Sequence, residues 1–318
     1  MNNELANALK NNNLKALSLI PKVDFHLHAS RSCRLNDFAD AFGVDKISCP
    51  DKFQGFNDME RWVSNNIHRY VNSTEDWEKR ISLMFLTQKK DMVNYYEPSF
   101  TIKDVKRYHS VTTFIETMKM LHRRIFPESH FAPCLSLSRK IDPRVIYKDV
   151  QECLETGWFR SIDLCNDETI GTIEDFVNIY KLANRHSIMR KAHVGEYGDF
   201  RNVINAISKL DLNEIQHGIT IVNDREAIKY AVRRDVLFNV CPASNIALGL
   251  CRNYSEHPIK KMFHEGLKIT ISTDDILVFN KSLSEQIMLL YRNSIFSSKE
   301  LSQILHNGFK RREMDWKK

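Results

Sequence analysis

The sequence predicts an α/β fold, a closed (β/α)8 barrel, and three observations lead to that prediction. Short apolar, β-branched runs alternate with longer amphipathic stretches, which is typical of a parallel sheet with helical crossovers. There are eight such runs, and a chain of 318 residues has an ordinary size for this barrel. No G-x-G-x-x-G motif follows the first run, which argues against a doubly wound, dinucleotide-binding sheet.

Each expected element follows from its hydrophobic period. The candidate strands are 22–28, 92–97, 131–137, 159–164, 188–194, 214–218, 236–240 and 267–272. The candidate helices between them have apolar residues three or four positions apart, and they are 103–125, 143–156, 172–186, 200–209, 224–234 and 257–265. No Gly-rich or Pro-rich linker divides the chain. We therefore expect a single domain over residues 1–318, with a helical segment at 1–20.

The long segment 29–90 after the first strand is expected to be a helical insertion over the barrel mouth. Its aromatic residues have helical spacing and are Phe38, Phe42, Phe53, Phe56, Trp62, Tyr70 and Trp77. Such a stripe is more typical of a packed core than of a ligand cage, with a substrate lid as the less favoured alternative.

Composition limits the compartment and the class of partner. The seven cysteines are scattered and form no C-x-x-C pair, which indicates a reducing compartment rather than a disulfide framework. No apolar run approaches the ~18 residues of a membrane span. The formal net charge is +6, but Lys and Arg are interspersed with Asp and Glu, which is typical of a solvated surface. We expect a cytoplasmic protein that does not bind membranes, and nucleic acid is not an expected partner.

Two histidines close the first candidate strand, in the sequence VDFHLHAS. His26 and His28 are two positions apart, so both side chains lie on one face of a strand and are expected to point into the barrel. Barrel enzymes form their active sites at the carboxyl ends of the strands. The residues that follow each apolar run therefore indicate the site.

Other strand ends also have imidazole or carboxylate groups. The fifth run ends in KAHVGE with His193 and Glu196, the sixth in IQHG with His217, and the eighth in ISTDD with Asp274 and Asp275. Taken one at a time, these residues have simpler interpretations, such as a core histidine or a helix cap. Their convergence on one end of the predicted barrel instead indicates a functional site.

Three imidazoles and one carboxylate suit a catalytic Zn²⁺ with one open position. The expected ligands of a single zinc ion per chain are His26, His28, His193 and Asp274. Such an ion lowers the pKa of water towards ~7. Glu196 is then expected to transfer protons, while His217 and Asp275 orient the water and the substrate.

Five segments, in order from about residue 20 to residue 310, resemble the adenosine deaminase family: PKVDFHLH, HVGE, QHGI, CPASNIALG and HPIKKMFHEGLKITISTDD. The resemblance implies a barrel of the metal-dependent hydrolase type. It implies hydrolytic removal of the 6-amino group of an adenine nucleoside, giving an inosine-type product and ammonia. It also implies the same four zinc ligands, Glu196 as the acid to purine N1, His217 on the attacking hydroxide and Asp275 towards N7.

Two departures from the family pattern leave the substrate open. The family usually continues H-x-H-L-D-G, whereas this chain has HLHAS with Ser30 in place of the aspartate, which is closer to the AMP deaminase branch. Arg31 and Arg34 follow, and either could pair with a 5′-phosphate or face solvent. The D-L-A-G-D-E motif appears as DLCNDE, with Asn166 in place of glycine. The candidate substrate-binding residues are Ser30, Arg31, Asp163, Asn166 and Gly195.

Several functions remain open on the sequence alone. The substrate could be adenosine, a phosphorylated adenosine such as AMP or ATP, or a modified adenosine. A binuclear amidase would need a lysine at the end of the fourth strand, where this chain has IDLCND; Lys191 lies upstream of His193 and is expected to be packed or solvated. The barrel could also be an inactive binding or scaffold protein. The sequence does not predict an oligomeric state.

Overall fold

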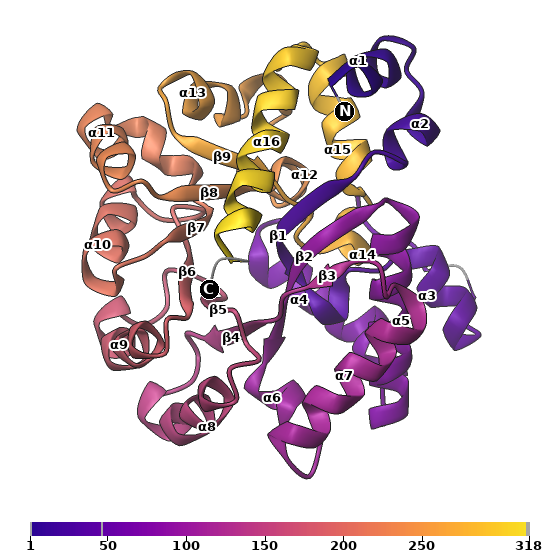
Figure 1. Ribbon diagram of the computed structural model, residues 1–318, viewed down its shortest axis with the longest axis vertical. Coiled ribbons are helices and arrows are strands. Elements are labelled where there is room, and N and C mark those ends of the chain that lie inside the picture. The colour runs from indigo at the N-terminus through magenta and orange to yellow at the C-terminus, as the bar shows by residue number, and fades with distance from the viewer. Residues whose placement is uncertain (1, 46, 316–318) are drawn as a thin grey trace.

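The computed structural model describes residues 2–45 and 47–315, and it confirms the predicted barrel (Figure 1). All strand pairings in the sheet are parallel. The strands are β1 (Lys22–His28), β2 (Val93–Thr101), β3 (His130–Phe131), β4 (Cys134–Ser138), β5 (Ser161–Cys165), β6 (Met189–Val194), β7 (Glu214–His217), β8 (Leu237–Val240) and β9 (Lys268–Ile271). Their order is β1-β2-β4-β5-β6-β7-β8-β9, with β3 paired to β2 alone.

The barrel closes between β1 and the residues just after β9. The backbone N–H of Asp274 donates to the carbonyl of His26 at 2.9 Å, and Leu27 forms an isolated parallel bridge with Asp274. The closing link is therefore made by residues next to, and among, the predicted metal ligands.

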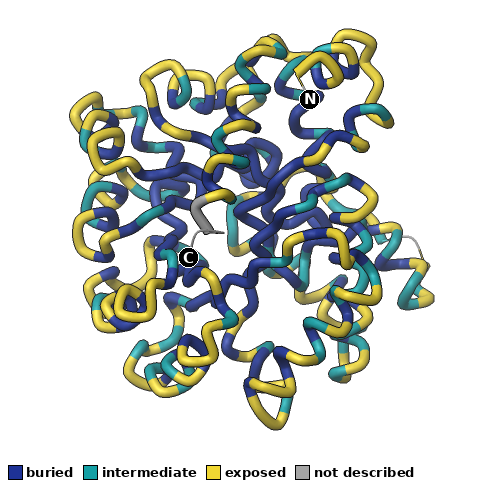
Figure 2. Tube along the Cα trace, viewed as in Figure 1, coloured by how far each residue is buried: buried dark blue, intermediate teal, exposed yellow. Residues whose placement is uncertain are grey.

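The predicted helices surround this sheet, and their outer faces are exposed while the strands are buried (Figure 2). They are α6 (Ile102–Val105), α7 (Val111–Ile125), α8 (Pro143–Glu155), η3 (Ile173–Phe176), α9 (Val177–Arg185), α10 (Phe200–Leu210), α11 (Arg225–Arg233) and α13 (Ile259–His264). Two short helices, η4 (Ile219–Asn223) and η5 (Tyr254–Glu256), lie outside the predicted ranges. The predicted helix 103–125 is divided, because the Ser110 side chain caps a new helix by accepting from the Thr113 N–H. The predicted strand 131–137 is divided around Pro133, which has no N–H to donate.

The segment 1–20, expected to be helical, contains two helices, α1 (Asn2–Lys10) and α2 (Leu14–Ser18). Four further helices were not predicted: α12 (Pro242–Ala247), α14 (Ile276–Phe279), α15 (Leu283–Arg292) and α16 (Ser298–Asp315). Helix α16, yellow in Figure 1, packs against β1 and β9. Gly308 permits this approach, because a Cβ atom there would lie 2.3 Å from Val23 Cγ2. The amino-terminal end of the barrel is thus covered by α16, and the site must lie at the other end.

The segment after β1 contains η1 (Ala29–Arg31), α3 (Leu35–Phe42), α4 (Phe56–Asn66), η2 (His68–Tyr70) and α5 (Thr74–Lys90). Phe38, Phe53 and Met59 form a second apolar cluster with residues that follow β8 and β9, such as Leu248 and Leu277. This cluster fixes α3 and α4 beside the barrel mouth. Trp77 is an exception to the predicted stripe, because it packs in the main core against Phe100 and Phe114. Within the described residues, no helix is both long and apolar enough to span a membrane.

Candidate active site

The four predicted metal ligands come together at the carboxyl end of the barrel. His26 and His28 come from β1, His193 from β6, and Asp274 from the segment after β9. One ligand atom from each of these residues lies within 4.8 Å of the others. Segments that are more than 160 positions apart in sequence are therefore joined at one point by the topology of the sheet.

Hydrogen bonds on the outer ring nitrogens orient two of these imidazoles. His28 Nδ1 lies 2.9 Å from Ser99 Oγ, and His193 Nδ1 lies 3.2 Å from Asp163 Oδ1. Each ring therefore turns its Nε2 atom to the centre, as outer partners do in metal sites. The buried Nε2 atom of His26 has no hydrogen-bond partner within residues 2–45 and 47–315. The Nε2 atoms of His26 and His28 each lie 3.4 Å from Asp274 Oδ1. A donor set of this chemistry, with a central nitrogen that has no hydrogen bond from the described residues, fits a divalent cation.

The protonation states of two ligands suit the same interpretation. Burial lowers the pKa of His26 to about 4, although Asp274 opposes that shift. Burial alone would raise the pKa of Asp274, but His26 and the other imidazoles hold it well below its ordinary value. A neutral imidazole and an ionised carboxylate are the forms that bind metals.

Three residues around the pocket have left-handed backbone conformations: Asn166 (φ 76°), His217 (φ 63°) and Asp274 (φ 60°). Non-glycine residues rarely adopt this region, and such strain is concentrated at functional sites. Asparagine is among the residues that tolerate it best. This tolerance explains how Asn166 can stand where the family has glycine.

Glu196 lies in the loop after β6, and a second carboxylate fixes that loop. Glu168 accepts hydrogen bonds from the backbone N–H groups of Gly195 at 2.7 Å and Gly198 at 2.5 Å, and also from that of Tyr197. Burial, followed by the charge of Asp274, raises the pKa of Glu196 well above its ordinary value. The loop therefore presents a carboxyl group that tends to keep its proton.

A chain of hydrogen bonds sets the proton position on His217. The Ile259 N–H donates to His257 Nδ1 at 3.1 Å, so His257 must donate through Nε2 to Asn245 Oδ1, also at 3.1 Å. The Asn245 amide nitrogen then faces His217 Nδ1 at 3.2 Å and Glu196 Oε1 at 3.4 Å. His217 accordingly accepts at Nδ1 and has its proton on Nε2, which lies 3.8 Å from Asp274 Oδ2.

The sequence alone indicates no role for Asn245 or Glu168. Asn245 lies within the quoted CPASNIALG segment and Glu168 within DLCNDE. A buried amide that joins two candidate catalytic groups is recognisable only when its neighbours are known. Both are positioning residues, because they act through Glu196 or His217.

The pocket above these residues has a volume of about 130 Å³. Ser30, Arg31 and Asn166 line it, as predicted substrate-binding residues would, together with Glu196, His217 and Asp275. The other two predicted contacts lie elsewhere. Asp163 is fully buried behind His193 and pairs with its ring. Gly195 turns towards α10, where a Cβ atom would lie 2.4 Å from Val203 Cγ2, and its N–H is occupied by Glu168.

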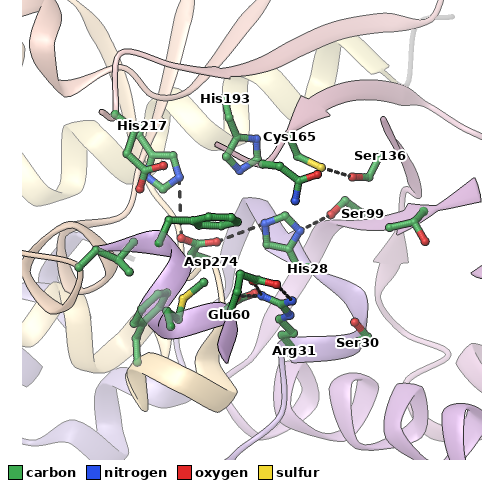
Figure 3. A pocket seen from close by; sticks show the side chains of 18 of the residues that line it. His28, Ser30, Arg31, Glu60, Ser99, Ser136, Cys165, His193, His217 and Asp274 are labelled. Carbon is green, nitrogen blue, oxygen red and sulfur yellow. Dashed lines mark hydrogen bonds and ion pairs between the residues drawn. The ribbon is translucent and has the colours of Figure 1, made fainter. Parts of the chain in front are cut away.

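The two arginines considered for phosphate binding have different positions. Arg31 lines the pocket, and its guanidinium pairs with both carboxylate oxygens of Glu60 at 2.5 and 3.1 Å (Figure 3). It also donates to Asp275 Oδ2 at 3.1 Å. Arg34 instead pairs with Glu285 Oε2 at 2.6 Å and donates to the Asn280 carbonyl. Neither arginine is simply solvated.

Lys191 was expected to be packed or solvated, and it is fully buried inside the barrel. Its Nζ atom pairs with Glu97 Oε2 at 2.5 Å and Glu214 Oε2 at 3.1 Å. Lys191 is therefore a buried ion-pair residue, and it does not bridge two metals at the pocket.

Comparisons with known proteins agree with this geometry. The adenosine deaminase family model matches residues 159–318. A Treponema pallidum (strain Nichols) protein named as an adenosine/adenine deaminase is 30% identical over 268 residues, covering 84% of this chain and 90% of that protein. The crystal structure of an Arabidopsis N6-mAMP deaminase is similar, with a TM-score of 0.80, 17% identity, and coverage of 92% of this chain and 93% of that one. A Burkholderia ambifaria amidohydrolase with bound Zn has a TM-score of 0.78 and 21% identity, covering 92% and 86%.

Proposed function

Because this chain belongs to the adenosine deaminase family and is an aminohydrolase enzyme, we propose that it catalyses zinc-dependent deamination of a 6-aminopurine nucleoside. Water replaces the 6-amino group, and the products are the inosine-type nucleoside and ammonia. The observation that supports this proposal most strongly is the convergence of four metal-binding side chains beside a buried carboxyl group. The substrate partner is a small purine.

The expected cation is one zinc ion per chain, held by His26, His28, His193 and Asp274. Three imidazoles and a carboxylate suit zinc, and the structurally similar Burkholderia amidohydrolase has bound Zn. Zinc at this point supplies Lewis acidity and a source of nucleophilic oxygen at neutral pH.

The chain's own residues have separate tasks in this proposal. Glu196 donates its proton to purine N1, which withdraws electrons from C6 and makes that carbon open to attack. His217 donates from Nε2 to the oxygen nucleophile and orients it. Asp275, whose Oδ1 atom has no hydrogen-bond partner within the described part of the chain, faces the N7 side of the purine. Ser30 and Asn166 are proposed to contact the rest of the substrate.

A substrate panel tests the proposal. The zinc-loaded protein is incubated with adenosine, deoxyadenosine, adenine, AMP, ATP and S-adenosylhomocysteine. Ammonia release and the ultraviolet change from adenine to hypoxanthine are recorded for each compound. We expect at least one neutral nucleoside to be deaminated. Folded, zinc-loaded protein that releases no ammonia from any compound would contradict the proposed activity and favour an inactive binding or scaffold role.

A phosphorylated substrate is the second candidate. The observation in its favour is Arg31 in the pocket wall, together with the fold shared with an N6-mAMP deaminase. The cytoplasmic location inferred from the cysteines stays a prediction.

A further inference from the structure

We propose that Glu60 makes this pocket selective for uncharged 6-aminopurine substrates over their phosphorylated forms, because it occupies the guanidinium of Arg31. This inference rests on the proposed function, since it concerns which purine enters the same site. Glu60 belongs to α4 of the insertion and Arg31 to η1 directly after β1. The pair therefore joins the insertion to the barrel at the pocket wall.

The contact geometry shows what a phosphate would have to displace. Arg31 uses Nη1 and Nη2 on the two oxygens of Glu60, at 2.5 and 3.1 Å. This bidentate arrangement is the one that arginine offers to a phosphate. A third bond, from Nη1 to Asp275 Oδ2 at 3.1 Å, uses more of the donor capacity. Arg31 is thus neutralised by carboxylates of this chain before a substrate arrives.

The other charges of the pocket wall oppose an anion as well. Among the described residues that line the pocket, Arg31 is the one lysine or arginine, and the acidic residues are Glu60, Asp104, Glu196, Asp274 and Asp275. The proposed function assigns a proton to Glu196, and zinc would offset the charge of Asp274, but the carboxylates of Glu60, Asp104 and Asp275 would remain. A phosphate with ~1.5 to 2 negative charges would be repelled there. Exclusion by like charge is a common way to obtain specificity.

Two nearby cations do not replace Arg31. The side chain of Arg34 is paired with Glu285 at 2.6 Å, outside the set of residues that line the pocket. Lys140 is exposed and lies with Nζ 5.7 Å from the centre of the Phe56 ring. It also lies outside that set.

The test removes the charge of Glu60 and leaves its shape. Glu60→Gln, Glu60→Gln combined with Arg31→Met, and the wild type are compared for kcat/KM on the best nucleoside of the panel and on its 5′-monophosphate. Glu152→Gln is the matched control, because Glu152 is an exposed acid on α8. We expect Glu60→Gln to shift the ratio towards the monophosphate by about tenfold or more, and the double variant to lose that shift. Glu152→Gln should leave the ratio unchanged.

Calorimetric binding of AMP to the same zinc-loaded proteins separates this inference from the proposed activity. If no purine is deaminated, the activity fails, but tighter AMP binding by Glu60→Gln that requires Arg31 still supports the role of Glu60. Three results would overturn the inference: a wild type that turns over or binds the monophosphate as well as the nucleoside, a Glu60→Gln protein with unchanged selectivity and unchanged AMP binding, or a gain that survives loss of Arg31.

Discussion

Two clusters of buried charge lie inside the same barrel, and they differ in whether the chain itself satisfies the polar groups at their centre. The inner cluster surrounds Lys191, whose Nζ atom contacts Glu97, Glu214 and the Phe25 carbonyl. Glu214 in turn accepts from Asn239 at 2.8 Å and from Arg311 at 2.5 Å. The three hydrogens of the lysine ammonium thus have three acceptors.

The mouth cluster consists of the four candidate metal ligands and Asp275. These are also buried charged or polar groups, but some of their atoms lack a hydrogen bond from the described residues. His26 Nε2 and Asp275 Oδ1 are buried without a hydrogen bond among the described residues, and His26 Nε2 lies 3.4 Å from Asp274 Oδ1. A buried polar atom without a hydrogen bond is costly, and its persistence requires an explanation such as a ligand. In this barrel the chain itself satisfies the Lys191 ammonium of the inner cluster, whereas the mouth cluster leaves His26 Nε2 and Asp275 Oδ1 without a hydrogen bond from the described residues.

The largest expected effect is a loss of catalytic rate at the barrel mouth in a protein that remains folded. Glu196→Gln removes the proton that we assign to N1, so kcat should fall by about 10²–10⁴-fold. Zinc content and the urea midpoint should stay at their wild-type values. Steady-state kinetics with metal analysis provide the check, and a variant within tenfold of wild-type kcat would remove Glu196 from the mechanism.

We expect a substitution in the inner cluster to lower the stability of the fold. Lys191→Met leaves Glu97 and Glu214 buried with fewer cationic partners, and we expect the free energy of unfolding to fall by about 3–5 kcal/mol. Lys229→Met is the matched control, because Lys229 is half exposed and pairs with Glu226 on the surface. That control should cost less than about 1 kcal/mol. Equal losses in the two variants, measured by urea unfolding, would refute the distinction.

A substitution of Asn245 tests whether activity depends on the orientation of the His217 ring. Asn245→Ala removes the amide that fixes the rings of His217 and His257, and kcat should fall by about 10–100-fold with a smaller change in KM. Nitrogen NMR of His217 should show that its Nε2–H form is no longer favoured. Asn205→Ala, which alters a surface asparagine bonded to Glu174, is the control. A wild-type NMR pattern in Asn245→Ala would contradict the assigned hydrogen-bond chain.

The smallest expected effect concerns pH. Burial lowers the pKa of His257 to about 3, whereas the unfolded chain has a value near ~6.5. Between these values the unfolded state binds more protons, so stability falls as pH falls through that window. From pH 7 to pH 5 this residue should cost about 2 kcal/mol. Urea unfolding of wild type and His257→Gln at both pH values measures the difference, and identical pH slopes would contradict it.

Much of this site could be predicted because strand ends in a parallel barrel converge. The spacing of His26 and His28, and the polar residues after three later strands, place the metal ligands without knowledge of any helix. The same reasoning could not distinguish a residue that contacts the substrate from one that orients a metal ligand. Asp163 looks like a substrate contact in sequence, but strand β5 places it behind His193.

The remaining differences arise from partners that are distant in sequence. Arg31 could be interpreted as a phosphate ligand until Glu60, 29 positions away, was found on its guanidinium. Asn245 has no visible role until His257 and Ile259 fix its orientation. The covering helix α16 was missed because the strand and helix alternation ends at β9, and the helices beyond it do not follow that pattern.

Zinc stoichiometry tests the central claim most directly. The wild type and a double variant, His26→Asn with His28→Asn, are loaded with zinc, dialysed and measured by elemental analysis. We expect about one zinc ion per chain in the wild type and almost none in the folded double variant. A wild type that retains no zinc, or a double variant that retains a full equivalent, would contradict it.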